Sequence, residues 1–371
     1  MEKLIRSLHI ASVVDVNLAL AGLLFDLAFL AGENQRSWGY KRAAKAVLRL
    51  DRQITPLVEA NTFRAIPGIG PTTDRIAREL IHGGTSAFVE QAVGESGKAD
   101  KVEALRSLRQ HFLSRAAVTE ILGRPGAPSV AKYRGDFQMH SVWSDGVEPL
   151  ESIVAACLAN GHRCAGMTDH SYGLSIAGGM SMAQVAAQHA AIDVLNREYK
   201  GRFRLFKGIE ANIRGDGTID MERDELRQFE FVVASPHSLL RKSIDQTARM
   251  VGAVSQPGVA ILGHPMGRKY NGRPGVSADW DQVFAVAAAR DVAIELDGSF
   301  DRQDIHYELA AGALEKGCLF ALDSDAHANP ELAFSEIAIA HARLAGIPPD
   351  RIINYWPEKK LVAWMEERRE S

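Results

Sequence analysis

The alternation of apolar and polar positions changes character near residue 135. Up to that point apolar residues recur at helical spacing; in the segment 41–54, Ala44, Val47 and Leu48 share one face, and most basic residues lie elsewhere. Beyond it, short apolar runs of strand length alternate with helical runs. The pattern predicts a helical N-terminal part followed by an α/β C-terminal part.

Seven strands are expected in the C-terminal part. They are DFQMH (136–140), RCAGMTDH (163–170), FRLFKGIEANI (203–213), FEFVVASPH (229–237), GVAILGHP (258–265), VAIELDG (292–298) and CLFALDSDAH (318–327). Helical runs lie between several of them, which is the alternation of parallel β/α units. The sequence therefore predicts a single β/α barrel, in which functional residues gather at the C-terminal ends of the strands.

These patterns divide the chain into three parts. We predict a helical domain over residues 1–95, a linker over 96–134 and the barrel domain over 135–371. The linker holds one helical run near 102–113 and a Gly/Pro break, GRPGAPS, at 123–129.

The apolar run at 10–30 follows two basic residues and could be mistaken for a targeting or membrane segment. Asp15, Asn17 and Asp26 interrupt it, and two carboxylates would be costly inside a bilayer. No small-residue cleavage site follows the run. We therefore expect a helix of a folded domain and no membrane association.

Composition adds two points. With 371 residues, of which 46% are hydrophobic, the chain can build a large core and is expected to hold two domains. The charge is uneven: residues 1–134 carry 19 Lys and Arg against 13 Asp and Glu, whereas residues 135–371 carry 24 against 33. A basic arm attached to an acidic body is the resulting picture.

The three cysteines, Cys157, Cys164 and Cys318, match no metal or redox spacing and lie in apolar segments. We interpret them as small buried apolar residues. Free cysteines and the absence of an export signal favour a cytoplasmic protein.

The segment FRAIPGIGPTTDRIAREL (63–80) resembles a helix-hairpin-helix, a module that grips the nucleic-acid backbone without reading sequence. Gly68 and Gly70 would let the turn approach a phosphate, and the amides of the next helix, from Thr72 onward, would point at it. The alternative is a simple tight turn. Pro71 and Asp74 depart from the usual pattern, and both weaken the expected phosphate grip.

A basic helix precedes this hairpin, with Lys41 and Lys45 on its polar side. Such a charge run is ordinarily solvated surface. Beside the hairpin it favours binding to DNA, and we predict that Lys41, Lys45, Gly68, Gly70 and Thr72 contact it.

The ends of the predicted strands carry the chemistry. Histidines and carboxylates recur there: His140, Asp169, His170, Glu210, His237, His264, Asp297, Asp325 and His327. Imidazole and carboxylate ligands without thiolate suit Zn, Mn or Fe. The donors are too many for one ion, and paired divalent ions suit phosphoryl displacement. The sequence predicts a multinuclear metal site and a phosphoesterase.

The motifs GDFQMHSVWSDG, MTDHS, GIEANI, VVASPHS, ILGHPMGR and LDSDAH, taken in order, resemble the polymerase and histidinol phosphatase (PHP) superfamily. The resemblance covers about 235 residues and is strongest to the C-terminal PHP domain of bacterial family X DNA polymerases. It implies a distorted seven-stranded barrel with two or three divalent ions. The N-terminal helices resemble the first domain of that family more weakly.

The resemblance also implies the ligand sets. Glu210 would bridge two metals, one held also by His140 and Asp325 and the other by His237 and His264. Asp145, His170 and His327 would hold a third metal, and Asp169 would orient its neighbour. The residues predicted to act in catalysis are Glu210, Asp325 and Arg268; Arg268, with Lys269, would hold the substrate phosphate unless both are ordinary surface charges.

Gln138 stands where many PHP proteins have a further histidine. An amide oxygen is a weaker donor than imidazole. Some family X polymerases share this glutamine, which favours a nucleic-acid role. We predict that Gln138 contacts a metal that is loosely held.

Three functions are compatible with these features. The first is a metal-dependent nuclease or 3′-end-processing phosphoesterase that acts on DNA in repair; the others are a small-molecule phosphomonoesterase, such as a histidinol-phosphate phosphatase, and a non-catalytic DNA-binding protein. No segment is long enough to form a nucleotidyltransferase palm between the hairpin and the barrel. We therefore expect that the chain does not polymerise DNA.

Overall fold

The computed structural model describes residues 14–370, so the start of the apolar run at residues 10–13 and the basic residues before it lie outside the described residues. The chain divides into two compact units. The first runs to Pro125 and includes Tyr270–Gly272, and the second comprises Gly126–Lys269 and the chain from Arg273 onward. Each unit is described by itself.

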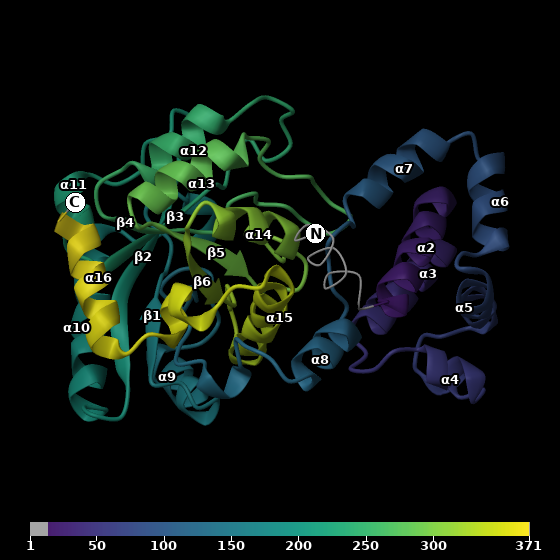
Figure 1. Cartoon of the computed structure of the whole chain (residues 1–371), viewed down its shortest axis with the longest axis horizontal. Coiled ribbons are helices and arrows are strands. Elements are labelled where there is room, and N and C mark those ends of the chain that lie inside the picture. The colour runs from purple at the N-terminus through teal and green to yellow at the C-terminus, as the bar shows by residue number, and fades with distance from the viewer. Residues whose placement is uncertain (1–13, 371) are drawn as a thin grey trace. The chain divides into compact units, whose positions relative to one another are not determined.

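The described part of the first unit contains helices and no strand (Figure 1). The helices are α2 (Val16–Ala31), α3 (Gln35–Leu48), α4 (Thr55–Glu59), α5 (Pro71–Gly83), α6 (Ala87–Glu95), α7 (Ala99–Ser107) and α8 (Arg115–Gly123). Helix α3 buries Ala43, Ala44, Val47 and Leu48, and its basic side chains are exposed. The helical character predicted for this region is therefore confirmed.

The polar residues that interrupt the apolar run are bonded within this unit. Buried Asp26 forms ion pairs of 2.7 Å with Arg106 and 2.6 Å with Arg109. The Asn17 amide donates to the carbonyl of Val47 and accepts from the amide of Ile54. A buried charge needs such partners, and so α2 belongs to a packed helical unit. None of the described helices combines the length and the apolar character needed to cross a bilayer.

The second unit is built on a curled sheet of six parallel strands in chain order. The strands are β1 (Cys164–Met167), β2 (Arg204–Asn212), β3 (Phe231–Ser235), β4 (Val259–Leu262), β5 (Ala293–Asp297) and β6 (Leu319–Asp323). Each lies inside a segment predicted as a strand. Because the strands are buried on both faces, they read as continuous apolar runs, which is why the sequence located them.

Helices surround this sheet (Figure 1). They are α9 (Leu150–Ala159), α10 (Met182–Glu198), α11 (Arg223–Leu226), α12 (Thr247–Val254), α13 (Trp280–Ala289), α14 (Tyr307–Glu315), α15 (Ser335–Ala345) and α16 (Glu358–Glu370). The alternation of strand and helix that the sequence predicted is present.

The sheet has one strand fewer than predicted, because the segment 136–140 does not form a regular strand. It runs beside both edge strands: Gly166 of β1 donates to the carbonyl of Asp136, and His140 donates to that of Ala326. The amides of Phe137, Gln138 and Met139, however, donate to side chains of Asp323, Asp136 and Thr168. Backbone amides that would form hydrogen bonds within a β-sheet therefore donate to side-chain oxygens instead.

An apolar cluster closes the barrel at the N-terminal ends of its strands. It contains Cys164, Phe231 and Leu319, which are the first residues of β1, β3 and β6, and Trp364 of α16 packs against them. The C-terminal ends are left for polar groups. All three cysteines are buried, as predicted, and burial raises the pKa of each thiol.

His162, between α9 and β1, makes the fold sensitive to acid. It is buried with its edge against the Tyr133 ring, its Nδ1 has no hydrogen-bond partner, and burial lowers its pKa to about 4. The unfolded chain therefore binds a proton below about pH 6.5 that the folded chain takes up only near pH 4, so stability is lost as the pH falls through this window.

Replacing His162 with Gln should weaken that loss. Between pH 7 and about pH 4.5, His162→Gln should lose about 2–3 kcal/mol less unfolding free energy than the wild type. Urea unfolding at a series of pH values measures the difference, and exposed His82→Gln is the control, expected to follow the wild-type profile. An unchanged profile for His162→Gln would contradict the burial argument.

Candidate metal centre

The residues predicted as ligands are brought to one edge of the sheet. Glu210 lies near the end of β2, His237 and His264 come two residues after β3 and β4, and His170 and Asp325 follow β1 and β6. Parallel strands present their C-terminal ends on the same side, and so these side chains converge. His140 ends the irregular segment between β1 and β6, and Asp145 and His327 lie in the loops that follow.

Glu210 is the centre of the arrangement. Its side chain is buried; Oε1 lies 2.9 Å from Nε2 of His264 and 3.4 Å from Nε2 of His237. Its Oε2 lies 3.0 Å from Nδ1 of His170 and 3.4 Å from Nε2 of His140. One carboxylate therefore faces four imidazoles. Burial opposes ionisation of Glu210, but the charge of His170 and His237 holds its pKa well below the usual value.

Asp145 lies close to three of the histidines. Its Oδ1 lies 3.5 Å from Nε2 of both His170 and His327, and 3.7 Å from Nδ1 of His140. The His140 ring stacks between those of His170 and His327, with centroids 4.4 Å from each. Asp325 completes the set, 3.1 Å from Nε2 of His140.

Three groups of atoms could each hold an ion. Within each group, one ligand atom from every residue lies within 4.8 Å of the others: His140, Asp145, His170 and His327; His170, Glu210 and His237; and His140, Glu210 and Asp325. His264 adds to the second through its contact with Glu210.

Buried atoms without hydrogen bonds support metal ligation. Nδ1 of His140, His170 and His264 and Oε2 of Glu210 are buried and make no hydrogen bond. Nδ1 of His170 lies close to Oε2 of Glu210 but without hydrogen-bond geometry. An unbonded buried polar atom costs free energy, and among these atoms Nδ1 of His170 lies 3.0 Å from Oε2 of Glu210 and Nδ1 of His140 lies 3.7 Å from Oδ1 of Asp145. The donor set fits divalent ions such as Zn, Mn or Fe.

A network behind the cluster holds the ligands in place. The Asp169 carboxylate accepts bonds from the Ser141 amide and from the hydroxyls of Ser141 and Ser144, and so it fixes the loop between His140 and Asp145. Nδ1 of His237 lies 3.2 Å from Asn212. Oriented ligands of this kind bind metal more tightly.

Two ligands have a backbone conformation that is costly for them. His264 has a φ of 23° and Asp325 a φ of 52°, both on the left-handed side that non-glycine residues seldom adopt. Such residues persist where the surroundings fix them. The amide of His264 is held by the carboxylate of Glu295, at 2.5 Å.

The carboxylates of the site shift the pKa values of the histidines beside them. Burial opposes the charged form of His170 and His327, but carboxylates outweigh it: Glu210 and Asp145 raise the pKa of His170 to about 10, and Asp145 and Asp325 raise that of His327 to about 9. Burial and the charge of Arg302 lower the pKa of His264 to about 4. The carboxylates therefore stabilise positive charge beside His170 and His327.

Arg302 is a residue that the sequence did not reveal. Its Nη1 lies 2.8 Å from Oδ2 of Asp325 and 3.8 Å from Oδ2 of Asp297. Burial opposes its charge, but these carboxylates raise its pKa. Arg302 lies in an irregular loop, SFDRQD, and no spacing in that loop signals a contact with β6.

The remaining predicted residues are less directly placed. Arg268 is buried near Asp304, and burial lowers its pKa to about 10; Lys269 pairs with Asp301 at 2.8 Å. Asp297 is buried beside Arg302. Gln138 is fully buried, and neither atom of its amide has a hydrogen-bond partner, which is the condition of an unused ligand.

The chain has relatives among characterised and named proteins. No protein-family model matches it. It is 31% identical over 238 residues to the DNA polymerase/3′-5′ exonuclease PolX of Bacillus subtilis, an alignment that covers 64% of this chain and 42% of that protein. A probable phosphatase of Caldicellulosiruptor bescii is 29% identical over 170 residues, or 43% of this chain and 68% of the relative.

The solved structures that match part of this chain include a histidinol phosphate phosphatase of Lactococcus lactis, complexed with zinc, L-histidinol and phosphate. It has a TM-score of 0.43 and 18% identity, and the match covers 57% of this chain and 94% of that one. Because the alignment with PolX spans less than half of that protein, the activity of the whole relative does not transfer directly.

Gln138 gives this site a test that does not depend on activity. Since imidazole is a stronger donor than an amide oxygen, Gln138→His should retain its metal longer, with release into chelator slowed on the order of tenfold. Metal analysis during timed dialysis measures this, with exposed Gln282→His as the matched control and Glu210→Gln expected to lose ions. Equal retention by Gln138→His and the wild type would argue against the contact.

Proposed function

We propose that this chain, as a phosphoesterase of the polymerase and histidinol phosphatase (PHP) superfamily, hydrolyses phosphate esters at DNA ends. In this proposal it is a metal-dependent nuclease or 3′-end-processing enzyme of DNA repair. The observation that carries the proposal is the convergence of three ligand groups on Glu210, His140 and His170. The likeness to PolX supports a nucleic-acid substrate.

The predicted ligands other than Gln138 are divided among three ions in the proposed mechanism. We assign one ion to His140, Glu210 and Asp325, a second to Glu210, His237 and His264, and a third to Asp145, His170 and His327. Bound divalent ions supply activation of a water and neutralisation of charge on the phosphoryl group. The protein fixes the ligands through Asp169, Asn212 and the backbone.

Arg302 is the group that we assign to the substrate phosphate. Its guanidinium is anchored on Asp325 through Nη1, and its side chain is 24% exposed, so further N–H groups can reach a ligand. A guanidinium held in this way presents a planar pair of donors that matches phosphate oxygens. Arg268, the residue predicted for this role, is more deeply buried and would act behind it.

The first unit supplies features that suit a DNA backbone. Helix α5 begins at Pro71 after Gly70, and no side chain caps it, so the amides at Thr72 and Thr73 lack a side-chain acceptor. Gly68 has a φ of 91°, and the Arg42 side chain of α3 packs beside it. These features support a phosphate contact by the hairpin.

The exposed face of α3 adds charge and an aromatic surface. Lys41 and Lys45 are exposed, and the Trp38 ring is 73% exposed with Nζ of Lys41 5.9 Å from its centroid. Exposed aromatic rings beside basic residues are typical of surfaces that stack unpaired bases. Asp74, which weakens the motif, pairs with Arg78 at 3.1 Å, and this offsets part of its charge.

A small-molecule phosphomonoesterase is the second candidate, favoured by the relatives named probable phosphatases. In that case the first unit would have no role in turnover. A DNA-binding protein without activity is the third, and the intact ligand groups weigh against it. The two enzymatic candidates differ in whether the basic helix matters.

The basic helix can be tested by charge reversal. Lys41→Glu/Lys45→Glu should lower kcat/KM on end-labelled DNA about 10–100-fold and make it less dependent on salt, because phosphate contacts are lost. Turnover of a small phosphate ester should be unchanged. Lys98→Glu/Lys101→Glu makes the same charge change on two exposed lysines at the start of α7 and serves as the control. Equal effects of the two double variants would exclude a specific DNA contact at α3.

Substitutions of Arg302 and Asp325 should have different effects on turnover and on metal content. Arg302→Gln should raise KM and lower kcat/KM on a phosphate ester about 10–100-fold, the value of a charge-assisted hydrogen bond, while the metal content stays the same. Arg302→Lys should recover part of the loss. Asp325→Asn should abolish turnover and lose metal. Unchanged turnover in Asp325→Asn would refute the assignment of the site.

A further inference from the structure

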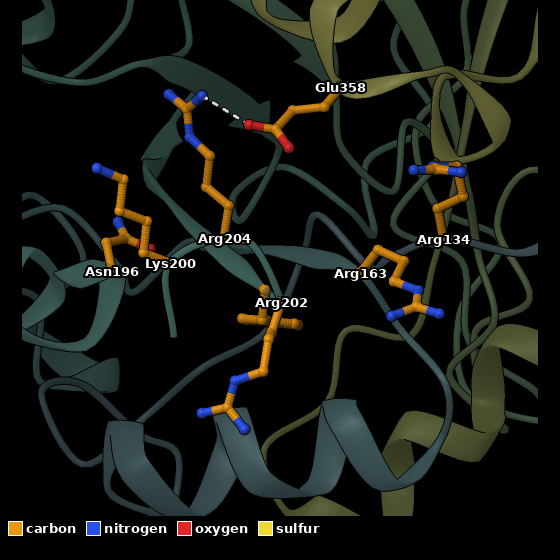
Figure 2. A pocket seen from close by; sticks show the side chains of 9 residues that line it. Arg134, Arg163, Asn196, Lys200, Arg202, Arg204 and Glu358 are labelled. Carbon is orange, nitrogen blue, oxygen red and sulfur yellow. Dashed lines mark hydrogen bonds and ion pairs between the residues drawn. The ribbon is translucent and has the colours of Figure 1, made fainter. Parts of the chain in front are cut away.

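A polar cavity lies in the barrel unit, away from the candidate metal centre. Its volume is ≈ 470 Å³, and its charged lining residues are Arg134, Arg163, Lys200, Arg202, Arg204 and Glu358. Figure 2 shows that these side chains come from several separate segments of the chain. Five cations and one carboxylate therefore share one hollow.

The cavity lies at the opposite end of the sheet from the predicted ligands. Arg163 directly precedes β1, and Arg204 is the first residue of β2. Glu210 lies six residues further along β2, which at about 3.3 Å per residue is roughly 20 Å away. A molecule in this cavity would not touch the metal ligands.

The positive charge of the cavity is only partly balanced. Arg204 is paired, 2.6 Å from Glu230 and 3.1 Å from Glu358, and Figure 2 shows the second of these pairs. Among residues 14–370, no carboxylate pairs with Arg134, Arg163, Lys200 or Arg202. The domain around them has more acidic than basic residues. Clustered cations repel one another, and this repulsion is relieved when an anion binds.

The groups around the cavity recognise charge and have little capacity to read a base. The Asn196 amide is fully engaged, since it donates to the Leu205 carbonyl and accepts from the Leu205 amide. Phe203 is buried, and the Arg202 guanidinium lies over the Tyr199 ring, 5.0 Å from its centroid. Guanidinium groups match phosphate oxygens with paired hydrogen bonds.

The arrangement favours a compact anion over a long strand. Cations from three segments of the chain surround a single hollow, and its volume lies in the range of small-molecule sites. A nucleic-acid strand would be followed by a stripe of charge. We propose that this cavity binds the oligophosphate group of a small anion, such as the triphosphate or diphosphate of a nucleotide.

Binding would also act on helix α16. Glu358 begins this helix, and its carboxylate competes with an incoming phosphate for Arg204. The same helix closes the barrel through Trp364. A ligand that binds the folded state alone raises the melting temperature, which provides a second readout.

The test is calorimetric titration of the full-length, metal-loaded protein with sodium tripolyphosphate, ATP and inorganic phosphate. One equivalent of tripolyphosphate should bind, and ATP should bind with similar affinity, because the phosphate group is what the cavity reads. Arg163→Glu and Arg202→Glu should each weaken binding at least about tenfold. Both residues are exposed, so the variants should fold, and thermal unfolding verifies this.

Arg290→Glu is the matched control, since Arg290 is an exposed arginine three residues before β5 at the same end of the sheet. Its affinity should equal that of the wild type. Weakening by the same factor in all three variants would show general attraction and overturn the proposal. So would binding lost in Asp325→Asn and kept in Arg163→Glu, which places the anion at the metal centre.

Two further results would also overturn it. They are binding of ATP without binding of tripolyphosphate, and binding of a single-stranded oligonucleotide through Arg163 and Arg202 without binding of tripolyphosphate. These outcomes do not bear on the proposed hydrolysis of DNA ends. Hydrolysis is measured separately in the same variants, and Arg163→Glu should retain it.

Discussion

The burial of one carboxylate, that of Glu210, governs the active end of this molecule. An ionised carboxylate in a protein interior needs positive charge or hydrogen-bond donors around it, and four imidazoles contact the two oxygens of Glu210. Three of those imidazoles, from His170, His237 and His264, follow different strands, and His140 ends the segment 136–140, so the contacts require parallel strands that present their C-terminal ends on one side. Fold and site thus depend on the same charge.

Further carboxyl groups below the site extend this constraint. Glu295, Asp297 and Asp136 are buried, and burial raises the pKa of each, so they favour the neutral form. Glu210 and Asp325 have lowered pKa values and stay ionised. The difference follows from their neighbours, since histidines and Arg302 surround the second pair. Two residues of this cluster, His264 and Asp325, also have positive φ values.

Much of this could be predicted from sequence because it depends on local rules. Strands buried on both faces are continuous apolar runs, and their ends carried the histidines and carboxylates. The segment 136–140 looked like a strand, but its amides are bonded to Thr168 and Asp323, residues distant in sequence. Arg302 reaches Asp325 from a loop without periodicity. Both features arise from tertiary contacts, and no spacing along the chain records them.

Strand β2 carries opposite charges at its two ends, and this separates the two sites physically. Arg204 is the first residue of the strand and lies among cations, and Glu210 lies near the other end among the predicted metal ligands. The first half of the strand pairs with β1 and the second half with β3, and the strand is largely buried. A short, paired strand transmits little movement unless its neighbours shift with it. An anion at Arg204 therefore acts first on α16, through Glu358, and the geometry around Glu210 stays fixed by the histidines that contact it.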